Sequence, residues 1–183
     1  MAKMTRRKLF ANTLLATSVV TAGSLGLSAF WPAHAEPPRL LPKSERADRV
    51  LIEKAARRLT LFRDGKVLKT YEIALGFAPK GDKEREGDGK TPEGHYRIDR
   101  RNDRSRFYLS LGIDYPRPDQ RRTARAEGRD PGGDIFIHGQ PHRFKSGPAL
   151  SYDWTAGCAA VSNTEIEEIW QRVAIGTPVE IRP

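Results

Sequence analysis

The dipeptide Asp64-Gly65 is the strongest local constraint on how this chain folds, because it separates two strand-like segments. Both residues tolerate the positive φ angles that a two-residue hairpin loop requires. Residues 58–62 precede the turn and residues 67–75 follow it, and both segments have strand-like composition. The pattern therefore predicts an antiparallel β-hairpin over residues 58–75.

Further short strands are predicted along the rest of the chain, at residues 49–53, 96–98, 107–111, 135–137 and 177–181. The run at 135–137 is too apolar for a surface strand and is expected to pass through the core. Ser162 and Glu165 have the spacing of a capping box, and apolar residues follow them at helical intervals. The chain is therefore predicted to be mainly β, a sandwich or barrel with this one amphipathic helix and a second short helix at 120–127.

The first 35 residues have the features of an export signal. A basic start with Lys3, Arg6, Arg7 and Lys8 precedes a weakly apolar stretch, and Ala33-His34-Ala35 fits an A-x-A cleavage pattern. We expect residues 1–35 to be a signal peptide, residues 36–48 to be a proline-containing linker and residues 49–183 to form one domain. Residues 5–10 resemble a twin-arginine signal. An ordinary secretory signal and an uncleaved anchor are the alternatives.

The charge of the chain is positive but identifies no partner. Residues 1–35 carry four basic and no acidic side chains, so removing them lowers the formal net charge from +9 to +5 over 148 residues. No run of basic residues alternates with aromatic ones, which argues against nucleic-acid binding. Four arginines of the polar segment 114–133 are interpreted as a solvated face, with contact to anionic envelope polymers as the alternative; they are Arg121, Arg122, Arg125 and Arg129.

Cys158 is the only cysteine of the chain, and it follows Gly157 in a short polar segment. His138 lies twenty residues earlier, at the end of the apolar run 135–137. A thiol needs a nearby base to become a nucleophile at neutral pH, so the two residues are a candidate catalytic pair. A buried and inert cysteine is the alternative. Export to an oxidising compartment leaves this lone thiol without a partner for a disulfide.

Three segments together resemble a known family: residues 88–96, the sequence Ile137-His138-Gly139, and residues 155–158. In order and spacing they are similar to the YkuD-type L,D-transpeptidases, which are cysteine enzymes of bacterial peptidoglycan. The resemblance covers nearly the whole chain after residue 48 and implies a YkuD-like β fold. It also implies a location in the periplasm or cell envelope.

The resemblance implies roles for individual residues. Cys158 matches the nucleophile and His138 the general base, with the Gly139 carbonyl orienting the imidazole. Backbone N–H groups from Ala156 to Cys158, including that of Gly157, are expected to form an oxyanion hole. Substrate-binding positions are expected at the residues just before the cysteine, Tyr152, Trp154 and Thr155; half-buried packing without a substrate role is the alternative for the two aromatic residues. The chain departs from the common family pattern at Ala156 and Ala160, where a histidine and an arginine or asparagine are usual.

The implied reaction is two-step acyl transfer. The thiol attacks the L,D-peptide bond of a tetrapeptide stem, D-alanine leaves, and an amine on another stem, a D-amino acid or an envelope protein takes the acyl group. A hydrolase on the same site and a non-catalytic wall-binding module are the alternatives. No cofactor is expected, and the protein is expected to be a monomer. His142 is not expected to bind a metal with His138, because the intervening residues are not helical.

Overall fold

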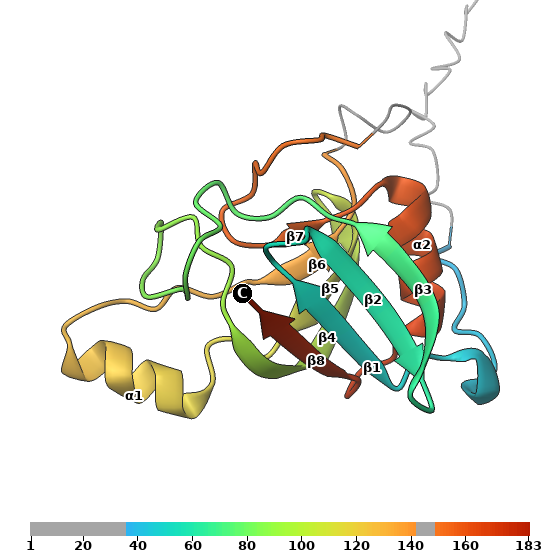
Figure 1. The fold of residues 1–183 in the computed structure, drawn as a ribbon, viewed down its shortest axis with the longest axis horizontal. Coiled ribbons are helices and arrows are strands. Elements are labelled where there is room, and N and C mark those ends of the chain that lie inside the picture. The colour runs from blue at the N-terminus through green and yellow to red at the C-terminus, as the bar shows by residue number, and fades with distance from the viewer. Residues whose placement is uncertain (1–35, 142–148) are drawn as a thin grey trace, which may run out of the picture. The chain divides into compact units, whose positions relative to one another are not determined.

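The computed structural model describes residues 36–141 and 149–183 (Figure 1). The predicted signal peptide and His142 lie outside these residues. The described part contains a short 3-10 helix at Lys43–Glu45, two α-helices and eight β-strands. In chain order these are β1 Arg49–Glu53, β2 Arg58–Arg63, β3 Lys66–Glu72, β4 Gly94–Ser105, β5 Tyr108–Ile113, α1 Pro118–Ala126, β6 Phe136–His138, β7 Ala159–Ala160, α2 Asn163–Arg172 and β8 Pro178–Arg182.

All eight strands belong to one mixed sheet with the order β3-β2-β1-β8-β4-β5-β6-β7. The pairs β1–β8 and β6–β7 are parallel, and the other neighbours are antiparallel. Ala74, just after β3, forms a bridge with Ala160 in β7, so the two edges of the sheet meet. This contact closes the sheet in the manner of a barrel. The prediction of a mainly β fold is confirmed.

The predicted hairpin is present as β2 and β3. Asp64 and Gly65 have φ angles of 49° and 75°, the left-handed conformations that the tight turn requires. Strand β3 pairs with β2 from Lys66 to Glu72, and the register shifts once between Leu61 and Phe62. The turn sequence therefore determines locally how β2 and β3 pair at one edge of the sheet.

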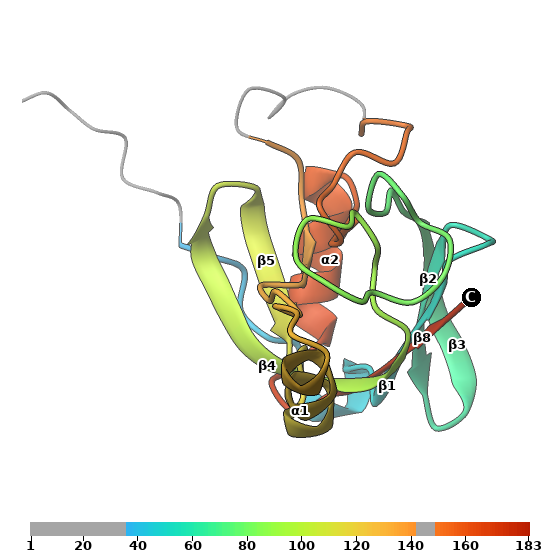
Figure 2. The ribbon, with the colours of Figure 1, turned by 90° about the vertical axis from the view of Figure 1, so that its left-hand side faces the viewer.

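Helix α2 lies in the space that the curved sheet encloses. Figure 2 shows it between the β4–β5 side and the β1–β3 side, and it contacts β5 directly. Its predicted capping box is present: the Glu165 amide donates to the Ser162 hydroxyl over 3.2 Å, and the Glu165 carboxylate accepts from the Ser162 amide over 2.8 Å. Ile166, Ile169 and Trp170 are buried, as the helical spacing predicts. Helix α2 is thus fixed immediately after the segment that holds Cys158.

The segment predicted as a linker runs along α2. The Leu41 and Ala47 amides donate to the carbonyl oxygens of Gln171 and Arg172, each over 2.9 Å, and the Trp170 indole donates to Pro38 over 2.9 Å. Three separate contacts therefore attach this segment to the end of α2. The proposed domain boundary at residue 49 stays a prediction.

Strand β4 is much longer than predicted, because its outer half is polar. Arg101 attaches the arginine-rich part of β4 to the end of α2. Its guanidinium group lies 3.8 Å over the Trp170 ring and donates to the Trp170 and Val173 carbonyls. Strand β7 was not predicted, since two alanines carry no strand pattern. It forms because β6 on one side and Ala74 on the other supply its hydrogen-bonding partners.

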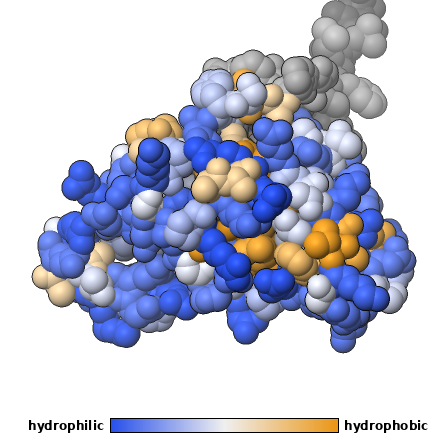
Figure 3. All heavy atoms as spheres, viewed as in Figure 1, coloured by the Kyte–Doolittle hydropathy of each residue, from blue (hydrophilic) through white to orange (hydrophobic). Residues whose placement is uncertain are grey.

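The surface of the described residues is largely polar. Figure 3 shows hydrophilic residues over most of one face, with a smaller hydrophobic area over the β1–β3 side. Neither α-helix in the described ranges has the length and apolar character that a bilayer crossing requires.

Candidate active site

Cys158 and His138 are brought together by the parallel strands β6 and β7. Ile137 pairs with Ala159 and His138 with Ala160, so Cys158 lies in register with Phe136. Paired residues of parallel strands point to the same face of a sheet, and residues two apart along a strand share a face. Cys158 directly precedes β7, so its side chain and that of His138 at the end of β6 are expected on one face of the sheet, two positions apart.

The Cys158 thiol is half-buried and held by backbone groups. Its sulfur accepts a hydrogen bond from the Phe136 amide over 3.4 Å and donates to the Asp134 carbonyl over 3.5 Å. Burial raises the pKa of the Cys158 thiol to about 11, although the Phe136 amide acts in the opposite direction. The thiol is therefore protonated at neutral pH.

The His138 ring is buried, with 2% of the residue exposed, and its orientation is fixed. Nδ1 lies 2.7 Å from the Gly139 carbonyl oxygen. Because a carbonyl only accepts, Nδ1 carries the proton and Nε2 is the free acceptor. Burial lowers the pKa of His138 to about 4, with the Gly139 carbonyl opposing the shift. The imidazole is thus a neutral base at neutral pH, in the tautomer that exposes Nε2.

Two aromatic rings enclose the imidazole. Phe107 stacks on His138 with 4.5 Å between ring centroids, and Trp154 meets it edge-on at 5.5 Å. Trp154 is half-buried, and its indole Nε1 is a buried donor without an acceptor among the described residues. Phe107 was recognised in the sequence only as part of a strand, since nothing in the local pattern indicates a contact with the histidine.

Thr155 closes the turn that carries Cys158. Its buried hydroxyl donates to the Cys158 carbonyl over 2.7 Å and accepts the Gly157 amide over 3.1 Å. The hydroxyl is therefore engaged within the turn. Tyr152, two residues before Trp154, is 62% exposed. Of the three positions expected to bind substrate, only Trp154 has an aromatic ring in contact with the His138 ring among the described residues.

An ion pair anchors the start of this turn. The Asp153 carboxylate accepts from the Arg57 guanidinium over 2.7 Å and from the Leu75 amide over 2.8 Å. Thr155 also pairs with the chain around Gly76 through backbone hydrogen bonds. The role of Arg57 was missed in the sequence, because it lies 96 residues from its partner. The anchor attaches the Cys158 turn to the hairpin side of the sheet.

The remaining glycine and alanine positions differ in their surroundings. A Cβ on Gly139 would lie 2.5 Å from the Asn163 Oδ1 atom, so a larger residue there would collide with the start of α2. Ala156 is exposed, whereas Ala160 is buried and pairs with His138. Within residues 36–141 and 149–183, no three His, Cys, Asp or Glu side chains are grouped as a metal site.

Position 157 requires glycine, because of both its backbone conformation and the lack of space for a side chain. Its φ angle is +136°, and a Cβ atom would lie 2.7 Å from the Lys90 carbonyl oxygen. We therefore expect Gly157→Ala to lower the free energy of unfolding by about 2 kcal/mol or more, from backbone strain and overpacking together. Urea denaturation measures the loss. Gly176→Ala is the control, because Gly176 also has a positive φ (+88°) but open space around it. Equal losses in the two variants would contradict the role of the Lys90 contact.

Comparison with known proteins gives the same family. The sequence profile of the YkuD L,D-transpeptidase catalytic domain matches residues 47–181. YafK of Escherichia coli K12 and YqjB of Bacillus subtilis 168 are both assigned by name to the L,D-transpeptidases. YafK is 33% identical over 109 residues, which are 58% of this chain and 37% of YafK. YqjB is 28% identical over 161 residues, which are 85% of this chain and 79% of YqjB.

A solved structure is also similar. The helical cell shape determining protein Pgp2 of Campylobacter jejuni superposes with a TM-score of 0.58 and 27% identity, over 73% of this chain and 46% of that protein. The chain thus spans less than half the length of YafK and of Pgp2. The profile covers the sheet, α2 and the Cys158 turn. The chain belongs to the YkuD family of L,D-transpeptidase catalytic domains.

Proposed function

We propose that this protein is a peptidoglycan L,D-transpeptidase, with Cys158 as nucleophile and His138 as general base. The observation that carries the proposal is the position of His138 at the end of β6, next to the chain that runs from Cys158 into β7, with the imidazole held in a single tautomer by Gly139. Membership of the L,D-transpeptidase family supplies the substrate class, which is the stem peptides of peptidoglycan.

The first step transfers one proton and forms one bond. Because the thiol and the imidazole are both neutral at pH 7, His138 Nε2 takes the thiol proton as the sulfur attacks the carbonyl carbon of the L,D-peptide bond. The tetrahedral intermediate collapses as the imidazolium returns the proton to the departing amine. D-alanine leaves, and the stem remains on Cys158 as a thioester.

The second step reverses these roles. An amine enters where D-alanine left, His138 accepts its proton, and the amine attacks the thioester carbonyl. Collapse of the intermediate forms the new amide and returns the proton to the Cys158 sulfur. Water in place of the amine gives hydrolysis.

Backbone amides of the Cys158 turn are proposed to bind the oxyanion. The Gly157 amide donates to the Thr155 hydroxyl, so it is directed into the turn. The Cys158 amide forms no hydrogen bond within the described residues. We assign the main oxyanion contact to this amide, since it lies on the residue that attacks. Thr155 and Gly157 then position the donor rather than contact the substrate.

The cell envelope is the proposed place of action. The family acts on a polymer of the bacterial envelope, and residues 1–35 have the sequence features of an export signal. Pgp2 is named as a helical cell shape determinant. By similarity to it, we propose that this chain also remodels peptidoglycan in a way that affects cell shape.

The test is product analysis after incubation with tetrapeptide muropeptides. Transfer predicts released D-alanine together with crosslinked dimers, or exchanged termini when a D-amino acid is added. Shortened tripeptide stems as the sole product would show a hydrolase instead. Binding of muropeptides without any release of D-alanine would show a non-catalytic wall-binding module.

A further inference from the structure

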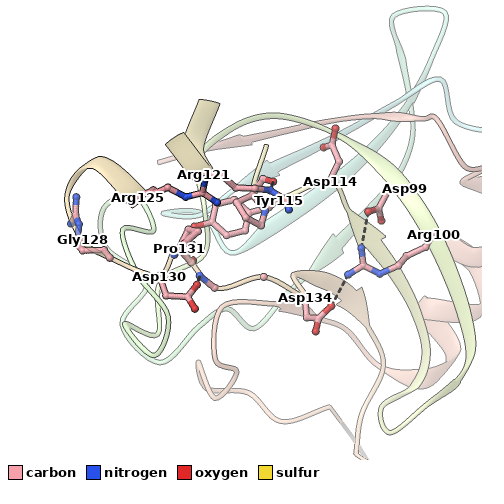
Figure 4. Close-up of a pocket in the computed structure, with 14 residues that line it drawn as sticks. Asp99, Arg100, Asp114, Tyr115, Arg121, Arg125, Gly128, Asp130, Pro131 and Asp134 are labelled. Atoms are coloured by element: carbon pink, nitrogen blue, oxygen red, sulfur yellow. Dashed lines mark hydrogen bonds and ion pairs between the residues drawn. The ribbon is translucent and has the colours of Figure 1, made fainter. Parts of the chain in front are cut away.

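A charged pocket adjoins the Cys158 site. It has a volume of about 750 Å³ (Figure 4). Its lining comes from α1 and the segments on either side of it, and from Asp99 and Arg100 in β4. Asp134 is part of its lining, and the carbonyl of the same residue accepts from the Cys158 sulfur over 3.5 Å. Figure 4 shows Asp134 with Arg100 at one end and Arg121 with Arg125 near Tyr115 at the other. The pocket therefore shares Asp134 with the surroundings of the thiol and extends to α1.

Helix α1 presents arginines to this pocket on one face. Arg121 and Arg125 are four residues apart, and both line the pocket, as does Arg129 just after the helix. Arg122, on the same helix, does not line it. Like charges at this spacing destabilise a helix by a few tenths of a kcal/mol, about 0.2–0.5 per pair. Because Arg121, Arg125 and Arg129 line the pocket, the interpretation of these arginines as a solvated face applies only to Arg122.

The pocket has as many aspartates as arginines, but most of these charges already have partners. Arg100 forms ion pairs with Asp99 over 2.7 Å and with Asp134 over 2.9 Å. Arg129 pairs with Glu84 over 3.3 Å and with Glu127. The charges of these groups are therefore already compensated by contacts within the protein.

The other two aspartates accept backbone amides. Asp114 accepts from the Arg97 amide and Asp130 from the Gly132 amide, each over 2.8 Å. Arg121 donates through Nε to the Pro116 carbonyl over 2.8 Å, and Arg125 has no ion pair within the described residues. The pocket thus keeps two guanidinium groups that no carboxylate of the described chain neutralises.

We propose that Arg121 and Arg125 bind a carboxylate of the stem peptide whose L,D-bond lies at Cys158. The inference rests on the proposed function and names a binding site for it. A guanidinium matches a carboxylate with two parallel hydrogen bonds, and such charge-assisted bonds are the strong ones. The two residues joined by the L,D-bond of a tetrapeptide stem each carry a carboxylate, at the C-terminus and on the diaminopimelate side chain, and the proposal concerns these two. Either carboxylate has the chemistry that the pocket requires.

The experiment compares three stems: the free tetrapeptide, its C-terminal amide and its diaminopimelate amide. The rate measured is kcat/KM for release of D-alanine, or of D-alaninamide from the C-terminal amide. Arg121→Gln/Arg125→Gln is the test variant, and Arg122→Gln is the matched control on the same helix. We expect the double variant to lose at least about 10-fold on the free stem, as loss of charged hydrogen bonds would give. The control is expected to match the wild type.

Amidation identifies which carboxylate is bound. At the recognised position it is expected to slow the wild type to the level of the double variant and to leave the double variant unchanged. Equal losses of the double variant on all three stems, or rates equal to those of Arg122→Gln, would overturn the inference.

Calorimetric titration of the same stems separates this inference from the proposed function. If the wild type releases no D-alanine, the proposed function fails, yet binding still tests the pocket. A preference for one carboxylate in the wild type that disappears in the double variant supports the site. Equal affinity for all stems overturns it.

Discussion

Cys158→Ala is expected to abolish D-alanine release from tetrapeptide stems, with a fall in rate of about 10⁴-fold or more. The sulfur forms the only covalent bond to the stem in the proposed reaction, so neither acylation nor transfer proceeds without it. Cys158 is the single cysteine of the chain, and no second thiol can replace it. Chromatography of released D-alanine measures the rate, and intact mass detects the stem attached to the wild-type protein.

The fold itself is expected to tolerate this change. The sulfur makes two long hydrogen bonds, of 3.4 and 3.5 Å, and the residue is half-buried. Cys158→Ser keeps the shape of the side chain and is the matched variant; it is expected to retain muropeptide binding while losing the acyl adduct. D-alanine release by Cys158→Ala at the wild-type rate would place the nucleophile at another residue.

The elements predicted correctly from the sequence are those whose pattern is local. Asp64-Gly65 specifies its turn through backbone conformation, and Ser162 with Glu165 specifies the start of α2 through two mutual hydrogen bonds. Strand β7 has no such pattern, because its two alanines become a strand only by pairing with β6 and Ala74. Long-range pairing of this kind is invisible in a short window of sequence.

The candidate site divides in the same way. Cys158 and His138 were recognised from residue types and spacing, and the fold places His138 on β6 and Cys158 immediately before the neighbouring strand β7. Phe107 on the imidazole and Arg57 on Asp153 are contacts between distant segments, so no local pattern indicates them. The ionisation states of Cys158 and His138 could be derived only from the structure, because they depend on burial. A thiol beside an imidazole suggests easier ionisation, whereas burial keeps both groups neutral here.

His138→Gln is expected to slow D-alanine release by about 10²–10⁴-fold, the usual contribution of a general base. The neutral imidazole is the active form, so wild-type activity should persist across the mildly acidic range and fall as the pH drops through about 4, where His138 becomes protonated. The residual rate of the variant should lack this step. His95→Gln is the control, since His95 is an exposed residue at the start of β4.

Stability against pH tests the same assignment without substrate. Burial lowers the pKa of His138 from 6.5 to about 4, so the unfolded state binds a proton at pH values where the folded state does not. The stability contribution is complete above pH 6.5 and is lost as the pH falls through about 4, amounting to about 3 kcal/mol. Urea denaturation between pH 7 and pH 4 should show this loss in the wild type and in His95→Gln, but not in His138→Gln. The same acid-dependent loss in His138→Gln would mean that folding does not lower the pKa of His138, so the imidazole would become protonated below about pH 6.5 and would then have no lone pair at Nε2 to take the Cys158 proton.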